Sequence, residues 1–136
     1  MSQENVNVVR RALEALAREE MEDAVADLAP DAEMHDYDIP DASVYRGPDG
    51  FLKWLGVWGE SWESWRFGEL EVPTGEHRVI ALFRMAVRGH GSGMEIARRD
   101  AVAYTLRGGK ILRMEYYNDQ RAALAAVDLS EQERSR

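Results

Sequence analysis

The sequence predicts an α+β domain in which helices from the two ends of the chain cover one face of a long antiparallel sheet. Three consecutive runs show the alternation of apolar and polar residues that is typical of strands, and they span Arg78–Arg88, Met94–Arg107 and Lys110–Tyr117. Gly108–Gly109 separates the last two runs and predicts a two-residue hairpin, because such turns need positive φ at their central residues. Apolar residues at helical spacing near the N-terminus supply the predicted cover.

The hairpin determines which side chains share a face of the predicted sheet. One face is apolar and carries Phe83, Met85, Val87, Val102, Tyr104, Leu106, Leu112, Met114 and Tyr116. The opposite face mixes charges with small residues and carries Arg84, Ala86, Arg88, Arg99, Ala101, Ala103, Thr105, Arg113 and Glu115. Because an apolar face has to be shielded from water, the helices are expected to pack on the first of these two faces.

Length and composition favour a single domain without a nucleic-acid or membrane partner. The chain has 136 residues, enough to bury roughly 68–70% of its unfolded surface. It carries 25 acidic and 17 basic residues, and a net charge of −8 argues against binding a phosphate backbone. The lack of cysteine excludes disulfides and thiolate chemistry. Neither an apolar run of about 18–20 residues nor a signal peptide is visible, so the expected location is the cytoplasm.

Two helices are predicted before residue 30, and both are interpreted as cover for the core. The first begins near Ser2 and places on one face Val6, Val9, Leu13 and Leu16. The second is short, is expected to stop at Pro30, and turns inward Met21, Ala24, Val25 and Leu28.

The densest polar cluster follows these helices. A short strand is predicted over Asp31–Tyr37, and it leads into the polar loop Asp38–Gly47. One interpretation makes His35 or Asp36 the acid or base of a pocket. The other makes them turn and cap residues, because aspartate side chains often bond to their own local backbone. The residues alone leave both interpretations open.

A third helix is predicted after the turn Gly47–Gly50. Its apolar stripe, with Trp54 beside it, comprises Phe51, Leu55, Trp58 and Trp62. Gly56 and Gly59 lie inside this helix and cost about 1 kcal/mol each relative to alanine. We interpret the tryptophans as core residues rather than as a cofactor site, although a buried indole N–H needs a partner and often marks a cavity wall.

The rest of the chain contributes a strand over Trp65–Val72, a final helix and a charged tail. The final helix is expected to be capped by Asn118 and Asp119, with Ala122, Leu124 and Val127 turned inward. Residues 130–136 are expected to fray. The three histidines, His35, His77 and His90, lack the close spacing of a zinc site, and no phosphate loop is present, so neither a metal nor a cofactor is expected.

Five segments together resemble a known superfamily: Glu4–Leu13, Asp31–Asp36, Tyr45–Gly50, Tyr104–Ile111 and Tyr116–Leu124. In this order they look like the nuclear transport factor 2-like superfamily, and specifically its SnoaL-like branch, which is related to polyketide cyclases and ketosteroid isomerases. The resemblance covers nearly the whole chain and places the domain at residues 1–129. It implies a cystatin-like, curved antiparallel sheet wrapped around the N-terminal helices, with a cone-shaped pocket.

Activity does not follow from this resemblance, because the fold hosts isomerases, epoxide hydrolases, cyclases, dehydratases and non-catalytic binders. Asp36 falls at or within one residue of the general base of ketosteroid isomerases. The isomerase's oxyanion acid and its partner tyrosine fall near Val102 and Leu13, which are apolar. The Asp-Arg-Asp set of limonene-type epoxide hydrolases falls on Phe83, Met85 and Tyr116. Neither of these known sites is intact here.

The expected site is an apolar pocket for a small hydrophobic molecule, walled by Trp54, Trp58, Phe83, Met85, Tyr104, Met114 and Tyr116. Its expected polar points are His35, Asp36 and Asp100. We expect Asp36 to be the general base of an isomerisation, cyclisation or hydration, because desolvation raises the pKa of a buried carboxyl group. Tyr116 or Tyr104 would then donate a hydrogen bond to a developing oxyanion.

The alternative is a non-catalytic ligand-binding protein or a structural homodimer. The mixed face of the sheet would be convex, and alanines in its middle would let a second copy approach closely. Such a two-fold interface would bury about 1,200–2,000 Å² in total. A protein-interaction module, a third possibility, would need a broad exposed apolar patch, which the sequence does not show.

Overall fold

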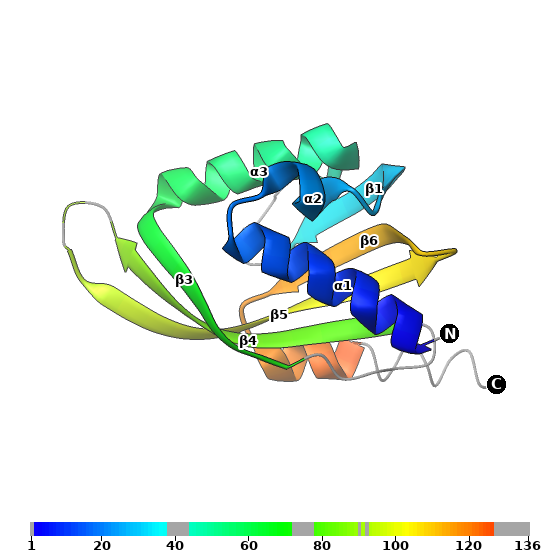
Figure 1. The fold of residues 1–136 in the computed structure, drawn as a ribbon. Helices are drawn as coiled ribbons and strands as arrows, with labels where there is room; N and C mark the ends of the chain where they lie inside the picture. Colours follow the sequence, from blue (N-terminus) through cyan, green and yellow to red (C-terminus); the bar gives the residue numbers. More distant parts are fainter. Residues whose placement is uncertain (1, 38–43, 72–77, 90, 92, 127–136) are drawn as a thin grey trace.

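The computed structural model describes residues 2–37, 44–71, 78–89, 91 and 93–126 (Figure 1). Its elements in chain order are α1 (Ser2–Ala17), α2 (Met21–Val25), β1 (Leu28–Asp36), β2 (Tyr45–Arg46), α3 (Gly47–Ser61), β3 (Trp62–Glu71), β4 (Arg78–Gly89), β5 (Glu95–Arg107) and β6 (Lys110–Tyr117), followed by a helix over residues 120–126. His77, His90, Val127 and the predicted tail at 130–136 lie outside the described residues. Within the described ranges, no helix is both long enough and apolar enough to span a membrane.

The strands form one six-stranded sheet in the order β2-β1-β6-β5-β4-β3. Every neighbouring pair is antiparallel except β1 and β6, which run parallel. The sheet is therefore mixed, whereas the sequence predicted an antiparallel one. The chain between β1 and β6 includes α3 and four strands, and a connection of that length permits parallel pairing. The predicted α+β architecture, with N-terminal helices against a curved sheet, is confirmed (Figure 1).

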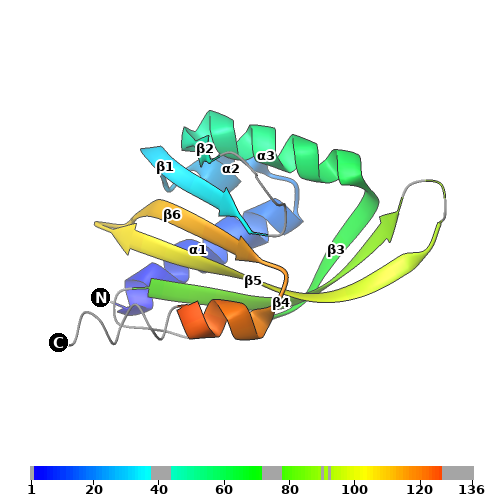
Figure 2. The same ribbon diagram turned by 180° about the vertical axis from the view of Figure 1, so that it is seen from behind.

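Two helices cover the concave face of the sheet. In Figures 1 and 2, α1 and α3 lie on one side of the sheet, and the helix of residues 120–126 lies on the other. Val6, Val9 and Leu13 of α1 are buried, as their helical spacing predicts. They join one hydrophobic cluster with apolar residues of α3 and of the inner faces of β4, β5 and β6. Burial of this cluster is the main favourable contribution to folding that the described residues show.

Some element boundaries differ from those predicted. α2 ends at Val25 and β1 already begins at Leu28, so Pro30 lies inside a strand rather than at the end of a helix. The pairing of β1 with β6 is irregular between Leu28 and Glu33, and an irregular stretch tolerates a proline that cannot donate a ladder hydrogen bond. α3 continues to Ser61 despite its glycines, and Trp62 begins β3 instead of completing the helical stripe.

The hairpin between β5 and β6 is formed as predicted, with φ of 59° and 77° at Gly108–Gly109. The register between the two strands shifts between Thr105 and Leu106, because Leu106 pairs with Ile111 and one residue is extra in β6. This bulge reverses the alternation beyond it. Ile111 is therefore buried on the concave face, while Leu112, predicted there, is only half-buried.

The final helix is capped as predicted and packs differently. The backbone N–H of Arg121 donates to Asp119 Oδ1 at 2.9 Å, so Asp119 caps the helix of residues 120–126. The buried residue of this helix is Ala123, whereas Ala122 and Leu124, predicted to face inward, are exposed.

This helix covers part of the convex face. Ala123 packs against Ile80, Ala101 and Ala103 in a second, smaller hydrophobic cluster. The small side chains on both sides allow the helix to approach the sheet closely. The two central alanines that were expected to face a second copy of the chain are therefore buried under the chain's own helix.

Candidate functional site

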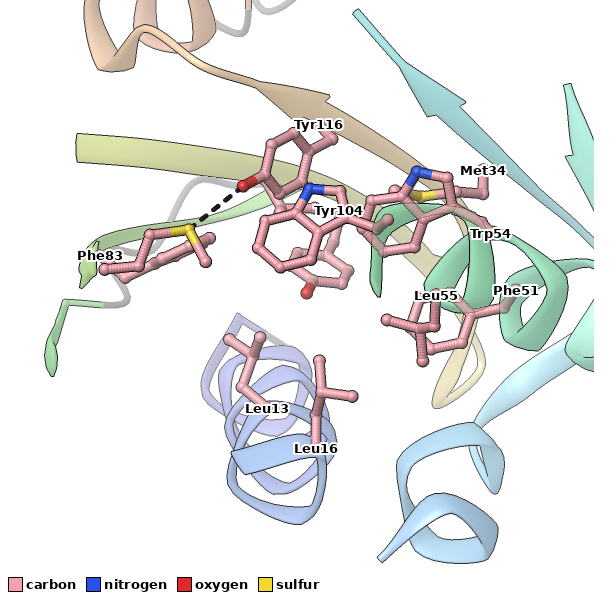
Figure 3. A pocket seen from close by; sticks show the side chains of 12 residues that line it. Leu13, Leu16, Met34, Phe51, Trp54, Leu55, Phe83, Tyr104 and Tyr116 are labelled. Carbon is pink, nitrogen blue, oxygen red and sulfur yellow. Dashed lines mark hydrogen bonds between the residues drawn. The ribbon is translucent and has the colours of Figure 1, made fainter. Parts of the chain in front are cut away.

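A small cavity of about 40 Å³ lies between the concave face of the sheet, α1 and α3 (Figure 3). Its lining comprises Leu13, Leu16, Met34, Phe51, Trp54, Leu55, Trp58, Phe83, Met85, Val102, Tyr104 and Tyr116. No charged side chain belongs to this lining, as far as the described residues form it. The cavity is therefore an apolar space with the polar tips of tyrosines and tryptophans at its wall.

Six of the seven predicted wall residues line this cavity, and Met114 is buried on the same face without lining it. Sequence reasoning placed Leu13, Leu16, Phe51, Leu55 and Val102 on inward faces but not at the site. Helical and strand periodicity were the signals available for them, and periodicity does not distinguish a cavity wall from solid core. Met34 was missed altogether, although it lies two residues before Asp36 and so shares its face.

Asp36 ends β1 and is almost fully buried on the concave face. Its parallel partner in the register is Tyr116 of β6. The indole Nε1 of Trp54 donates to Asp36 Oδ2 at 2.7 Å, and the rings of Trp54 and Tyr116 lie 5.6 Å apart. Trp54 and Tyr116 line the cavity and Asp36 does not. The predicted base therefore lies one hydrogen bond behind the cavity wall.

Asp100 is the second carboxylate behind this wall, and its side chain is fully buried. Arg98 Nη2 lies 3.1 Å from Asp100 Oδ2, and Arg98 Nε lies 3.3 Å from Oδ1, so the two side chains form an ion pair through both ends of the carboxylate. Sequence reasoning missed Arg98. The signal was its spacing of two from Asp100, which places both side chains on one face of β5.

Tyr116 connects Asp100 to the cavity. The Tyr116 hydroxyl is hydrogen-bonded to Asp100 Oδ2. The same hydroxyl lies 3.4 Å from Met85 Sδ, the contact drawn as a dashed line in Figure 3. A hydroxyl has one proton, and a carboxylate accepts it far better than a thioether sulfur does. The Tyr116 O–H therefore donates to Asp100. Gln120 Nε2 supports this region from the convex side by donating to the backbone carbonyls of Phe83 and Asp100, at 3.3 and 3.2 Å.

Tyr104 is the remaining hydroxyl of the wall. Its side chain is 4% exposed, and its register partner on β6 is Met114, two residues from Tyr116. None of the described residues hydrogen-bonds its hydroxyl. In Figure 3 that hydroxyl points from the sheet toward Leu13 and Leu16. Burial raises the pKa of Tyr104 well above its ordinary value, so the phenol stays protonated and neutral.

His35 lies on the opposite face of the sheet, and its predicted position in the pocket is wrong. Neighbouring residues of a strand point to opposite faces, so the inward position of Asp36 turns His35 outward. His35 Nε2 lies 2.8 Å from Glu33 Oε1, and Arg46 Nη1 donates to Glu33 Oε2 at 2.8 Å. These two hydrogen bonds hold the pKa of Glu33 below its ordinary value. Nowhere in the described part of the chain do three or more metal-ligating side chains gather.

His35 belongs to a convex polar cluster, which we define as Glu33, His35, Tyr37, Arg46, Arg78, Arg113, Glu115 and Tyr117. Glu115 is its centre and is only 7% exposed. It accepts hydrogen bonds from Arg78, from Tyr37 at 3.2 Å and from Tyr117 at 3.4 Å, and Arg113 Nε lies 3.4 Å away. Burial and the charge of Glu115 raise the pKa of Tyr117 to about 12.

Comparison with known sequences gives a family match. Residues 9–114 match the family described as the SnoaL-like domain. Proteins of Mycobacterium tuberculosis and Mycobacterium bovis, both described as uncharacterized, are 30% identical to this chain over 125 residues. The match covers 87% of this chain and 92% of each of those proteins.

Solved structures show the same fold at lower identity. TerC, co-crystallised with polyporic acid, superposes with a TM-score of 0.75 at 18% identity, covering 92% of this chain and 98% of that one. An NTF2-like protein of unknown function from Burkholderia pseudomallei also gives 0.75, at 19% identity, covering 90% and 95%. A protein with a ketosteroid isomerase-like fold from Catenulispora acidiphila, in complex with trimethylamine, gives 0.69 at 15% identity, covering 81% and 83%.

Proposed function

Because the chain belongs to the SnoaL-like domain family, we propose that it binds a small hydrophobic molecule in the cavity beneath α3. The observation that carries this proposal is a concave space lined by apolar and aromatic side chains from α1, α3 and the sheet. Small-molecule sites are usually concave and apolar, with a few polar groups that orient the ligand. Tyr104, whose hydroxyl no described residue bonds, supplies a polar group of this kind.

Two structural neighbours support small-molecule binding in general. TerC was crystallised with polyporic acid, and the Catenulispora protein is in complex with trimethylamine. At 18% and 15% identity these proteins support the use of the fold for small molecules and say nothing about which molecule binds here.

The size of the cavity limits the ligand. Its volume of about 40 Å³ exceeds the roughly 10–15 Å³ that one water molecule needs and is far below the roughly 300–1,000 Å³ of sites for drug-sized ligands. A molecule of a few heavy atoms fits with little change. A larger one requires the wall to repack, and the flexible side chains of Leu16, Leu55 and Met85 are the parts best able to do so.

For turnover we propose Asp36 as the general base. It would take a proton from a carbon next to a carbonyl group and return it to the product, and this transfer needs direct contact or one bridging water. The Trp54 indole stands between Asp36 and the cavity, so the indole has to move for the carboxylate to reach a ligand.

Ligand binding without turnover is the alternative, and a specific observation favours it. Both buried carboxylates are bonded to protein side chains and neither lines the cavity. Replacing Asp36 by asparagine separates the two functions once a ligand is known. Loss of product formation with unchanged ligand affinity supports catalysis, whereas the absence of any product from the wild-type protein supports binding alone.

Binding itself can be tested with methylenecyclopentane, a compact apolar probe, in an NMR titration of the full chain. Saturable shifts are expected at the residues that line the cavity, including Leu13 and Met85. Val102→Leu adds a methylene to the cavity and should weaken binding by about fivefold. Val79→Leu adds the same group at a buried concave-face position outside the lining and serves as the control. Shifts that do not saturate, or equal weakening by both variants, contradict the proposal.

We also infer a homodimer through the part of the convex face that the final helix leaves open. Ala97 is exposed there and pairs with half-buried Ala86, so a second sheet can approach closely. Sedimentation equilibrium should give twice the chain mass of 15.5 kDa at micromolar concentration. Ala97→Arg should return the monomer. Ala103→Arg is a poorer test, because Ala103 packs under the final helix. A wild-type mass of one chain contradicts this inference.

A further inference from the structure

The hydroxyl groups of Tyr104 and Tyr116 differ in what they can offer to a ligand, although both tyrosines line the same cavity. Val102 pairs with Tyr116 in the register, so Tyr104 lies one pleat further along the same face. On neighbouring strands such diagonal side chains stay within reach of one molecule.

Tyr116 has no proton to offer. Its O–H donates to Asp100, and Arg98 keeps Asp100 as an acceptor by contacting both carboxylate oxygens. Turning the Tyr116 proton toward a ligand would leave a fully buried carboxylate with one hydrogen bond fewer. Toward the cavity, Tyr116 therefore presents its ring and offers no hydroxyl proton.

Tyr104 has a proton to offer. Among the described residues nothing accepts a hydrogen bond from its hydroxyl, and the side chain is more than nine-tenths buried. Leu13 and Leu16, toward which the hydroxyl points, have no acceptor in their side chains (Figure 3). The desolvated phenol stays neutral at physiological pH, so it is a donor and not an anion.

We propose that the cavity selects a neutral ligand carrying a carbonyl or ether oxygen, and that this oxygen accepts a hydrogen bond from Tyr104. The inference rests on the proposed function of the cavity and names its ligand class. The Tyr104 hydroxyl faces an apolar cavity without a described acceptor, so a ligand that supplies the acceptor gains affinity relative to a shape-matched hydrocarbon. Among the described residues of the lining there is no cation to neutralise a carboxylate, so a neutral ligand is favoured over the anion of an acid.

Tyr104 is thus a specificity-determining residue, and of the two expected oxyanion donors the structure favours Tyr104 over Tyr116. If a ligand carbonyl is enolised at this site, negative charge develops on the oxygen that Tyr104 contacts. A donor already in place would stabilise that charge without reorganisation.

The test compares cyclopentanone with methylenecyclopentane, which has the same shape but carries CH₂ in place of the carbonyl oxygen. Dissociation constants for the wild-type full chain, Tyr104→Phe and Tyr116→Phe are measured by NMR titration. Tyr104→Phe should raise the dissociation constant of the ketone by roughly ten- to a hundredfold and change that of the alkene by no more than about twofold. The ratio of the two effects removes the difference in hydration between the probes. Tyr116→Phe, the matched control, should change both probes by similar factors.

The carbonyl stretch of bound cyclopentanone provides a second readout. It should shift to lower frequency in the wild-type protein and return toward its value in an apolar solvent in Tyr104→Phe. Equal effects of Tyr104→Phe on ketone and alkene, or a frequency shift that survives this variant, overturn the inference and leave the proposed function intact. If neither cyclopentanone nor methylenecyclopentane binds to any of the three proteins, the proposed function itself is overturned.

Discussion

On the concave face, Tyr104 lines a cavity with a hydroxyl that no described residue bonds. On the convex face, Glu115 accepts hydrogen bonds from three side chains and forms an ion pair with a fourth, Arg113. The same strands build both faces, since β6 turns Tyr116 inward and Glu115 outward. The convex polar cluster is the richer in charge, and its central carboxylate is satisfied by neighbouring side chains of the same chain. The comparison leads to the proposal made above, which places the ligand site at empty space beside a donor without a described acceptor and not at the greatest concentration of polar residues.

The largest effect is expected where a buried ion pair on the concave face is broken. Arg98→Met removes the ion pair between Arg98 and the fully buried Asp100 carboxylate and should lower the free energy of unfolding by about 3–5 kcal/mol. Urea unfolding followed by tryptophan fluorescence measures this. Arg99→Met removes the exposed neighbouring arginine and should change stability by less than about 0.5 kcal/mol. Equal effects of the two variants would mean that the Arg98–Asp100 ion pair adds nothing to the free energy of unfolding beyond what an exposed arginine adds.

The convex polar cluster should respond less strongly. Glu115→Gln keeps the shape of the side chain and removes the charge that Arg78 and Arg113 contact, so a loss of about 2 kcal/mol is expected. Glu95→Gln is the control, because Glu95 is exposed and lies 4.0 Å from Arg88. That exchange should cost under about 1 kcal/mol. If the two glutamate variants unfold at the same urea concentration, the charge of Glu115 contributes no more to stability than that of the exposed Glu95.

Alkaline titration distinguishes the tyrosines of the two faces. Tyr104 and Tyr117 both have a pKa raised above the ordinary value of 10, to about 12 for Tyr117. Above pH 10 the unfolded chain loses these protons and the folded chain keeps them, so stability falls as pH rises from 10 toward 12. Between pH 10 and 11 Tyr104 should account for up to about 1.4 kcal/mol, and the more exposed Tyr117 for less.

Unfolding experiments at pH 9, 10 and 11 on Tyr104→Phe and Tyr117→Phe measure these two contributions. Tyr104→Phe should remove the larger part of the alkaline loss. A steeper loss in Tyr117→Phe than in Tyr104→Phe would show that Tyr104 is less desolvated than its place in the cavity wall implies.

The smallest effect is expected for Asp36→Asn. The asparagine carbonyl can still accept the Trp54 N–H, and no packing volume is lost, so the free energy of unfolding should change by less than about 1 kcal/mol. Asp36→Ala removes the acceptor from a buried indole and should cost about 1–3 kcal/mol. Thermal unfolding of both variants provides the measurement. A large loss in Asp36→Asn would mean that the charge of Asp36, and not only its acceptor, holds this end of the cavity together.

Local pattern in the sequence was enough to predict the inner face of the sheet. Phe83, Met85, Val102, Tyr104 and Tyr116 all face the cavity because side chains alternate along a strand and the Gly-Gly turn sets the register of the last two strands. Both observations depend on residues close together in the chain, whereas the resemblance to the SnoaL-like family depends on the order of five segments along nearly the whole chain.

Tertiary pairing decided the rest. Strand alternation required His35 and Asp36 to face opposite sides, but only the parallel pairing with β6 put Asp36 beside Tyr116 and left His35 outside. The bulge in β6 places Ile111 instead of Leu112 on the concave face, and it depends in the same way on contacts between elements. The burial of Ala101 under the final helix depends on such contacts as well. Local periodicity predicts which residues share a face, whereas the partner of that face depends on contacts between residues far apart in the chain, and such contacts leave no periodic trace in a single sequence.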